Sequence, residues 1–225
     1  MQDLSGRMVI VTGAFGALGS SVADMLAERG AKLARVDRAD NPGGPGWRLG
    51  GIDLADEDSC KRAFRKAVED CGPVYGLVNI AGAFEMASLA EGGIDPWDRM
   101  YRTNLRTVLS ASSAALPYFK GAGRIVNIGA AAAAKASASM GAYAASKSGV
   151  ARLTESLAEE LRGSGITVNA ILPTIIDTPA NRAAMPQSEF AKWATPAGIA
   201  RVIAFLLSDE ASEVTGALIP VSGAN

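Results

Sequence analysis

Residues 12–19 read Thr-Gly-Ala-Phe-Gly-Ala-Leu-Gly, and this stretch decides the fold. It follows an apolar run that starts at Met8 and opens a helical pattern that starts at Leu18. A strand that ends in a glycine-rich turn before a helix directs backbone N–H groups at a phosphate, and glycines let a pyrophosphate come close. Glycines at this spacing also occur in ordinary tight turns that need a positive φ. The stretch alone therefore leaves a nucleotide site and a simple turn as alternatives.

The rest of the chain alternates short β-branched runs with longer helical patterns, which is typical of βαβ units and a parallel sheet covered by helices on both faces. The predicted strands are Met8–Thr12, Lys32–Val36, Arg48–Ile52, Gly76–Ile80, Arg124–Ile128, Thr167–Leu172 and Ala217–Val221. The predicted helices are Leu18–Arg29, Glu57–Glu69, Trp97–Phe119, Ala142–Arg162 and Pro196–Ser208. Residues 39–47 are rich in proline and glycine, so we expect a loop in the second crossover. The pattern predicts a single α/β domain over residues 1–225, with a seven-stranded sheet.

The composition narrows the classes of function. Of 225 residues, 48% are hydrophobic and the formal net charge is −1, so no broad basic field favours nucleic acid. No apolar run is long enough to cross a bilayer, so we expect no membrane partner. The chain has no histidine, and its two cysteines, Cys60 and Cys71, form no ligand motif, so we expect no metal site. The apolar run near the N-terminus is too short for a secretory signal, which favours a cytoplasmic location.

Two acidic residues sharpen the nucleotide prediction. Asp37 ends the second predicted strand, where a carboxylate accepts hydrogen bonds from the adenosine ribose hydroxyls and repels a 2′-phosphate. NAD is therefore the expected cofactor, and NADP is disfavoured although the cation Arg38 is the next residue. Asp53 and Leu54 end the third predicted strand, where an adenine edge would lie. Capping of a helix that starts near Asp56 is the alternative for Asp53.

Tyr143 and Lys147 stand four residues apart in Tyr-Ala-Ala-Ser-Lys, so on a helix both side chains project from one face. A phenol has a pKa of about 10, and bringing it near 7 needs roughly 4 kcal/mol of preferential stabilisation of the phenolate. A neighbouring ammonium group and an oxidised nicotinamide ring have the sign to supply much of it. Tyr143 is therefore the candidate acid and base. A surface pair on an amphipathic helix is the alternative that this spacing leaves open.

Several motifs occur together in a characteristic order. They are Thr12–Gly19, Asp37, Asp53-Leu54, Asn79-Ile80-Ala81-Gly82, Asn104, Tyr143–Lys147, and Pro173 followed by Asp177-Thr178-Pro179. In this order they resemble the short-chain dehydrogenases/reductases over nearly the whole chain. The resemblance implies a Rossmann-type, doubly wound parallel sheet of order 3-2-1-4-5-6-7. It also implies hydride transfer between NAD(P)(H) and a small carbonyl or alcohol substrate.

The resemblance implies roles for individual residues. Tyr143 would donate or accept the proton, Lys147 would lower its pKa and hold the nicotinamide ribose, and Asn104 would support a water relay to that lysine. The residues implied in cofactor binding are Gly13, Phe15, Gly16, Ala17, Leu18, Gly19, Asp37, Arg38, Asp53, Leu54, Asn79, Ala81, Gly82, Tyr143, Lys147, Pro173, Ile176 and Thr178. Two long helices pair subunits in this family, so we expect a homodimer or a homotetramer.

The chain departs from the family pattern where a catalytic serine is expected, because the residue thirteen before Tyr143 is Ala130. Losing one hydrogen-bond donor to the reacting oxygen typically costs about 2.7 to 4 kcal/mol of transition-state stabilisation. In a first interpretation Tyr143 serves a carbonyl or alcohol substrate alone or with Ser137 or Ser139. In a second, the substrate is a quinonoid dihydropteridine, since Ala130 and residues 172–193 resemble the dihydropteridine reductase branch. In a third, the chain is an NAD(H)-binding sensor or scaffold that has lost catalysis.

Large apolar side chains lie after predicted strand ends or within residues 174–195, a segment that resembles a substrate lid. We expect a planar or hydrophobic small-molecule substrate at Ala130, Phe84, Met140, Phe190 and Trp193. Core or subunit packing is the alternative for each of these residues. Arg182 is a cation of the same segment, and a polar substrate, a helix end and Glu189 are its alternative partners.

Overall fold

A computed structural model describes residues 4–223 and contains a parallel sheet of seven strands. The strands are β1 (Met8–Thr12), β2 (Lys32–Val36), β3 (Trp47–Leu49), β4 (Val74–Asn79), β5 (Phe119–Ile128), β6 (Ile166–Pro173) and β7 (Leu218–Val221). Their order, β3-β2-β1-β4-β5-β6-β7, confirms the predicted doubly wound, Rossmann-type fold class. Because every strand pair is parallel, all carboxyl ends lie at one edge of the sheet. Ligands of such sheets bind outside that edge where the strand order reverses, which here is between β1 and β4.

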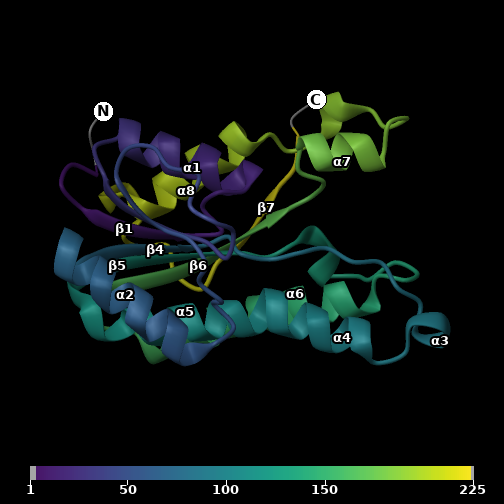
Figure 1. The fold of residues 1–225 in the computed structure, drawn as a ribbon, viewed down its shortest axis with the longest axis horizontal. Coiled ribbons are helices and arrows are strands. Elements are labelled where there is room, and N and C mark those ends of the chain that lie inside the picture. Colours follow the sequence, from purple (N-terminus) through teal and green to yellow (C-terminus); the bar gives the residue numbers. More distant parts are fainter. Residues whose placement is uncertain (1–3, 224–225) are drawn as a thin grey trace.

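Helices cover both faces of the sheet (Figure 1). On one face, α1 (Ala17–Glu28) packs against α8 (Pro196–Leu207). On the other face lie α2 (Glu57–Cys71), α5 (Thr107–Ala115) and α6 (Gly141–Glu160). Both faces of the sheet are therefore removed from water, which explains why its central strand β1 is apolar from Met8 to Val11.

Strand β1 shows how the two faces share one strand. Val9 and Val11 belong to the buried apolar cluster under α1 and α8. Met8 and Ile10 belong to the cluster on the opposite face, under α2 and α5. Successive side chains of a strand point to opposite faces, so a strand in the middle of the sheet needs apolar residues at every position.

The helix starts follow from local sequence. Asp56 caps α2, since its carboxylate accepts the Asp58 N–H, and Thr195 caps α8 by accepting the Gly198 N–H at 3.0 Å. Helix α1 starts after Gly16, which has no side chain, so its first turn has no side-chain cap. Among residues 4–223, no helix is long and apolar enough to span a membrane.

The long helix predicted over Trp97–Phe119 is divided, so that prediction is wrong in its extent. Helix α4 (Asp95–Met100) runs into a π-helical turn, η1 (Tyr101–Arg106), which continues into α5. A 3-10 turn at Leu116–Tyr118 follows, and Phe119 already begins β5. The ring and missing N–H of Pro117 explain why the α-helix ends there. Apolar spacing does not report a π turn, which closes hydrogen bonds over one residue more than an α turn.

The connections also differ in part from the predicted ones. Residues 39–46 contain no helix, as predicted for the second crossover. Strand β3 is shorter than predicted because Gly50 packs against the backbone of residues 39–41 and Gly51 adopts φ +72°. Two short helices that the sequence pattern did not predict, α3 (Leu89–Gly92) and α7 (Pro179–Ala184), lie toward the right-hand end of the molecule in Figure 1.

Candidate active site

The glycine-rich turn after β1 is packed against the segment that follows β4. Gly13 has φ +63°, and a Cβ added there would lie 2.8 Å from the Ala81 nitrogen. The Thr12 hydroxyl accepts hydrogen bonds from the N–H groups of Ile80 and Ala81 at 3.1 and 3.3 Å. These contacts bring two of the predicted motifs together at the point where the strand order reverses.

The other two glycines of the turn, Gly16 and Gly19, differ in the room they leave for a side chain. A Cβ at Gly19 would overlap the carbonyl oxygen of Gly13, so packing requires glycine there. A Cβ at Gly16 would meet only that oxygen, at an ordinary 3.6 Å. Gly16 therefore leaves open space at the uncapped N-terminus of α1, where Ala17 and Leu18 begin the helix. This cradle suits a phosphate group.

Asp37 is fixed beside this turn. Its carboxylate accepts the Phe15 N–H at 2.8 Å and the Ala39 N–H at 3.0 Å. The side chain is half-buried, whereas Arg38 next to it is exposed. A carboxylate held in this place keeps free lone pairs for ribose hydroxyls and repels a phosphate at the same position.

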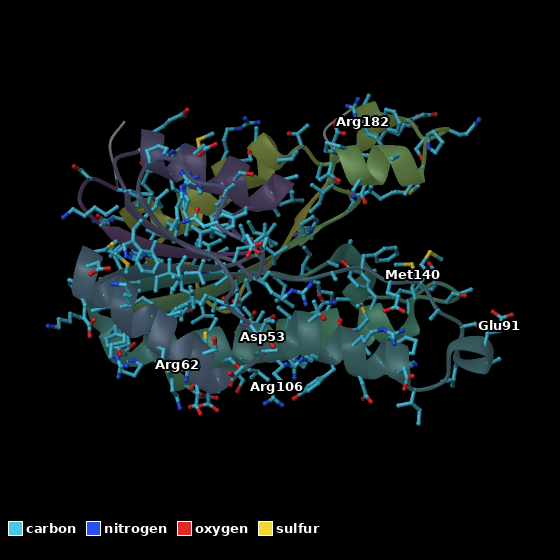
Figure 2. All side chains as sticks on the ribbon, viewed as in Figure 1. Asp53, Arg62, Glu91, Arg106, Met140 and Arg182 are labelled. Carbon is cyan, nitrogen blue, oxygen red and sulfur yellow. The ribbon has the colours of Figure 1, made fainter. Side chains whose placement is uncertain are left out.

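Asp53, labelled in Figure 2, lies in the connection between β3 and α2 and forms an ion pair with a residue of η1. It accepts the Ala55 N–H at 2.9 Å and an Arg102 N–H at 2.6 Å. Partial burial alone would raise its pKa, but these hydrogen bonds and the charges of Arg102 and Arg38 hold the pKa of Asp53 below its ordinary value. The capping alternative for Asp53 is wrong, because Asp56 takes that place at the start of α2.

Two of the residues implied in cofactor binding have side chains in the core. Leu54 is 4% exposed and belongs to the apolar cluster under α2. Asn79 is 2% exposed, and its Nδ2 donates to Asn127 Oδ1 at 2.9 Å. Their side chains stabilise the sheet and its covering helices, so a cofactor could meet only their backbones.

Tyr143 and Lys147 lie on α6 beside the segment that follows β4. Lys147 is 5% exposed, and its Nζ donates to the Ile128 carbonyl at 2.8 Å. The rings of Tyr143 and Phe84 meet edge to face, with centroids 4.9 Å apart and planes at 83°. A Cβ added at Gly82 would lie 3.4 Å from Lys147 Nζ. The pair therefore faces the interior of the site, and the alternative of a solvent-exposed helix face is wrong.

The acidic phenol expected from the Tyr143–Lys147 spacing stays a prediction, because it also depends on the positive charge of an oxidised nicotinamide ring. Burial raises the pKa of Tyr143 to about 12 and lowers the pKa of Lys147 to about 8. Both shifts have the same cause, since burial penalises whichever form carries the charge. The ammonium group of Lys147 is directed at the Ile128 carbonyl, and burial is the cause of the raised pKa of Tyr143.

Asn104 lies within η1, is fully buried, and uses both ends of its amide. Its Oδ1 accepts the Ala83 N–H at 2.7 Å, and its Nδ2 donates to Ser146 Oγ at 2.9 Å. The water relay implied for Asn104 stays a prediction. What the structure adds is a direct link from the segment after β4 to α6.

Ala130 lies buried at the end of β5, where its methyl group offers no hydrogen bond. In the loop before α6, Ser137 is exposed and Ser139 is half-buried. Within residues 4–223, neither hydroxyl donates to or accepts from Tyr143. Ser139 has φ +62°, and among residues 4–223 it is the only residue other than glycine with a positive φ. Its carbonyl accepts the Ala87 N–H at 2.8 Å.

The segment after β6 is tied to itself by backbone contacts. Ile176 pairs with Ala194 in an isolated parallel bridge, and Pro173 is buried at the end of β6. Thr178 caps α7 by accepting the Asn181 N–H at 3.2 Å. Ile176 and Thr178, both implied in cofactor binding, therefore also hold this segment in shape.

Aromatic and charged side chains pack together within the same segment. The guanidinium group of Arg182 pairs with both oxygens of Asp177, at 2.5 and 2.8 Å, and lies 4.7 Å from the centroid of the Phe190 ring. Phe190 meets Trp193 edge to face at 4.8 Å, and Trp193 is only 6% exposed. The alternative that Arg182 pairs with Glu189 is wrong, because Asp177 holds it. Packing within the segment explains Trp193 better than an open substrate wall.

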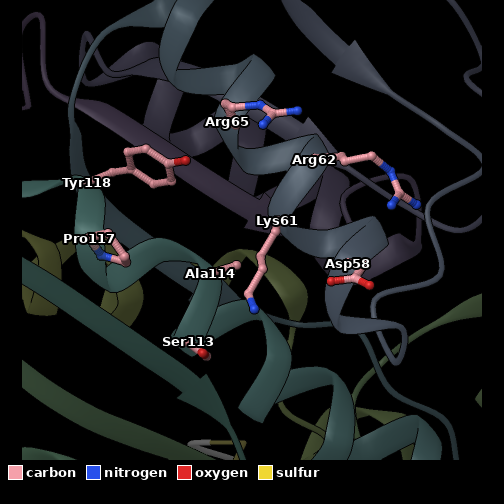
Figure 3. Close-up of a pocket in the computed structure, with 8 residues that line it drawn as sticks. All are labelled: Asp58, Lys61, Arg62, Arg65, Ser113, Ala114, Pro117 and Tyr118. Atoms are coloured by element: carbon pink, nitrogen blue, oxygen red, sulfur yellow. The ribbon is translucent and has the colours of Figure 1, made fainter.

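Phe84 and Met140 remain as open candidates for the substrate wall. Phe84 is 55% exposed although its ring touches Tyr143, and Met140 is half-buried directly before α6 (Figure 2). A separate groove between α2 and α5 is lined by Lys61, Arg62, Arg65 and Tyr118 among others (Figure 3). None of the predicted site residues lines that groove, so it is separate from the predicted site.

Sequence reasoning missed three side chains that organise the site. Arg102 pairs with Asp53, Arg106 Nε donates to the Ala55 carbonyl at 2.8 Å, and Ser146 contacts Asn104. The two arginines lie on the π-helical turn, whose existence the apolar pattern does not report. Ser146 could have been noticed, because a serine within a helix often bonds back to its own backbone.

Comparison with known proteins agrees with this geometry. The family model described as short chain dehydrogenase matches residues 7–189. A 3-oxoacyl-[acyl-carrier-protein] reductase from Vibrio cholerae is 31% identical over 98% of each chain. A cis-4-hydroxycyclohexanecarboxylate dehydrogenase from Sinomonas cyclohexanicum is 35% identical over 96% of this chain and 95% of its own. Ligand-free aldohexose dehydrogenase from Thermoplasma acidophilum superposes with a TM-score of 0.89 at 27% identity, over 97% of this chain and 93% of its own. The chain therefore belongs to the short chain dehydrogenase family and has the oxidoreductase fold of its relatives.

Proposed function

We propose that the chain is an NAD-preferring oxidoreductase that interconverts a small carbonyl compound and its alcohol. One observation carries the proposal. Tyr143 and Lys147 are largely buried on one face of α6, beside the Gly82 segment and within ring contact of the exposed Phe84. A phenol and an amine at the carboxyl edge of a doubly wound sheet are placed where its ligands bind.

The residues at the other end of the site fit a nicotinamide dinucleotide. The cradle at Gly16 and the uncapped start of α1 accommodate a pyrophosphate, and Asp37 accommodates the adenosine ribose. When bound, the cofactor supplies or accepts the hydride. The fixed carboxylate of Asp37 supports NAD over NADP, because a 2′-phosphate would face a negative charge.

Tyr143 moves the proton in this proposal. In reduction, the phenol donates its proton to the carbonyl oxygen as the carbonyl carbon gains hydride. A raised pKa keeps the phenol protonated at neutral pH, so it is ready for that direction. In oxidation, Tyr143 takes the alcohol proton, and the positive charges of Lys147 and of an oxidised nicotinamide favour the phenolate.

The side chains near the site support an uncharged substrate. Arg182 is neutralised by Asp177, and Arg99 is neutralised by Glu85 at 2.6 Å. Phe84 offers apolar surface next to the phenol, and the half-buried Met140 lies directly before α6. The relatives act, by their names, on a 3-oxoacyl chain, a hydroxycyclohexane ring and a sugar. We therefore propose a small ketone or secondary alcohol with an apolar or cyclic body.

A quinonoid dihydropteridine is the second candidate substrate, and Ala130 favours it. A ketone oxygen gains charge in the transition state and benefits from a hydroxyl at this position. A quinonoid pteridine accepts hydride with less need of that donor. The resemblance of residues 172–193 to the dihydropteridine reductase branch also supports a quinonoid dihydropteridine as the substrate.

A substrate panel with both cofactors tests these proposals. We expect turnover of at least one ketone, alcohol or quinonoid dihydropteridine, with kcat/KM at least tenfold higher for NADH than NADPH, or about 1.4 kcal/mol. Tyr143→Phe should lower kcat by about 100-fold or more. Equal use of the two cofactors would contradict the role of Asp37. NADH binding without turnover of any substrate would instead support a sensor or scaffold.

Subunit pairing and location stay proposals. Tyr101 and Leu109 are 47% and 38% exposed on the η1–α5 helix, an apolar surface that suits pairing with a second copy. Light scattering during gel filtration should give the mass of a dimer or tetramer. We also keep the predicted cytoplasmic location, which fractionation of the source cells would check.

A further inference from the structure

The hydroxyl of Ser146 is buried inside the helix that carries Tyr143. Ser146 is 5% exposed, and its Oγ donates to the Tyr143 carbonyl at 2.7 Å. The same oxygen accepts the Nδ2–H of Asn104 at 2.9 Å. Both the proton and a lone pair of this hydroxyl are therefore used, and both partners belong to the site.

We propose that Ser146 is a positioning residue that sets the place of Tyr143 through its backbone carbonyl. The inference rests on the proposed function of Tyr143 as proton donor. Ser146 joins Tyr143 to Asn104 on η1, and Asn104 in turn holds the Ala83 N–H at 2.7 Å. Three separate parts of the chain, the segment after β4, η1 and the first turn of α6, thus meet through one amide and one hydroxyl.

The same segment after β4 also reaches the phenol ring. Phe84 directly follows Ala83, and its ring meets that of Tyr143 at 4.9 Å. The backbone of Tyr143 is therefore held through Ser146 and Asn104. Its ring is held by Phe84, which directly follows the residue whose N–H Asn104 binds. Loss of the hydroxyl would free the first turn of α6 to shift relative to Phe84. Small displacements of a reacting group cost large factors in rate.

The Asn104 amide has no good substitute partner. Its other recorded acceptor is the Met100 sulfur at 3.6 Å, and a thioether is a weak acceptor. Removing the Ser146 hydroxyl would leave a buried N–H without a strong hydrogen bond, so Asn104 or α6 must move. Ser146 is also no replacement for the hydroxyl missing at Ala130, because its proton already goes to the Tyr143 carbonyl.

Thr154 offers a matched control on the same helix. Its Oγ1 donates to the Val150 carbonyl at 2.8 Å and accepts the Asn127 Nδ2–H at 2.9 Å. Thr154 is fully buried and lies two turns after Ser146 on α6. Within residues 4–223, its two hydrogen bonds go to Val150 and Asn127, and neither goes to Tyr143 or Lys147. Ser146→Ala and Thr154→Val each delete a hydroxyl with little change in shape.

The test compares these two variants with the wild type and with Ser146→Thr, which keeps the hydroxyl. We expect Ser146→Ala to lower kcat by about 10- to 100-fold. Its NADH dissociation constant, from fluorescence titration, should stay within about twofold. Thr154→Val should stay within about threefold in kcat, and Ser146→Thr should recover much of the loss. Loss of activity in parallel in Ser146→Ala and Thr154→Val, or an unchanged kcat in Ser146→Ala, would overturn the proposal.

A second readout does not depend on turnover. The chain has four tyrosines, so fluorine NMR of protein labelled with 3-fluorotyrosine gives few signals, and Tyr143→Phe identifies the one from Tyr143. Ser146→Ala should shift or broaden that signal, and Thr154→Val should leave it in place. If the Tyr143 signal does not move in Ser146→Ala, the positioning role is refuted, whether or not the wild type turns over a substrate. If the wild type turns over no substrate but the signal moves, only the proposed function is refuted. If Ser146→Ala does not fold, Ser146→Cys, with its weaker hydrogen bonds, should show the same shift to a smaller extent.

Discussion

Replacing Lys147 by methionine should stabilise the protein near neutral pH while it abolishes the proposed activity. Lys147 is 5% exposed, and burial lowers its pKa from 10.5 to about 8. Near pH 7 the folded protein therefore carries a buried ammonium group. The pKa of Lys147 thus falls from 10.5 to about 8 on folding, and each pKa unit is worth about 1.4 kcal/mol. Burying the charged group therefore lowers the free energy of unfolding by roughly 3 kcal/mol near pH 7.

The methionine variant does not recover all of this free energy. It loses the hydrogen bond from Nζ to the Ile128 carbonyl, worth about 1 kcal/mol. We therefore expect Lys147→Met to raise the free energy of unfolding by about 2 kcal/mol at about pH 7. Methionine is of similar length and apolar, so it fits the same buried space.

The pH dependence of this gain has a definite sign. Between pH 8 and 10.5 the unfolded chain binds a proton at Lys147 that the folded protein has released, so wild-type stability rises with pH from this group. The advantage of the variant should shrink over that window and reverse near its upper end. Cys60 and Tyr143, whose pKa values burial raises to about 12, lower the stability of both proteins above about pH 9 and cancel in the difference.

Urea unfolding of ligand-free protein, followed by circular dichroism at about pH 7 and pH 10, measures this effect. Lys135→Met, at an exposed position, is the control and should change stability little at either pH. A Lys147→Met protein that is less stable than the wild type at pH 7 would refute the reasoning. So would an advantage that does not change with pH.

Two further substitutions test the turn and the loop. Gly19→Ala should lower the free energy of unfolding by about 2 kcal/mol and weaken NADH binding, because the added Cβ overlaps the Gly13 carbonyl oxygen. Gly16→Ala is the control: the added Cβ has room there, so the free energy of unfolding should fall by less than about 1 kcal/mol. Urea unfolding measures both changes. Ser139→Gly should raise it by about 0.5 kcal/mol, since release from φ +62° outweighs the added freedom of the unfolded chain. Ser139→Val should lower it by more than about 1 kcal/mol, and a more stable valine variant would contradict the strain at this position.

The fold was predictable because its signals are local and repeat along the chain. Strands β1 and β2 match their predicted bounds, since each is a short run that a turn signal follows. The glycine-rich turn was predictable for the same reason, and packing alone requires glycine at positions 13 and 19. The order of the strands came from the family resemblance and not from any run of residues.

Features that depend on distant contacts were not predictable. The π-helical turn places Asn104 between Ala83 and Ser146, and no spacing within the helix records those two partners. The ion pair of Asp53 with Arg102 joins residues 49 positions apart. Burial raises the pKa of Tyr143 and lowers that of Lys147, and the spacing of the two residues does not report how much water they have lost.

The turn at Tyr101–Arg106 has a consequence for the whole helical stretch from α4 to α5. Each residue advances an α-helix by about 100°, so one additional residue changes the phase of everything on one side of it relative to the other. Shortening the stretch by a single residue would restore a regular helix and swing the amide of Asn104 out of register with the two groups it joins. The irregular turn therefore lies at the place where one amide joins the segment after β4 to α6.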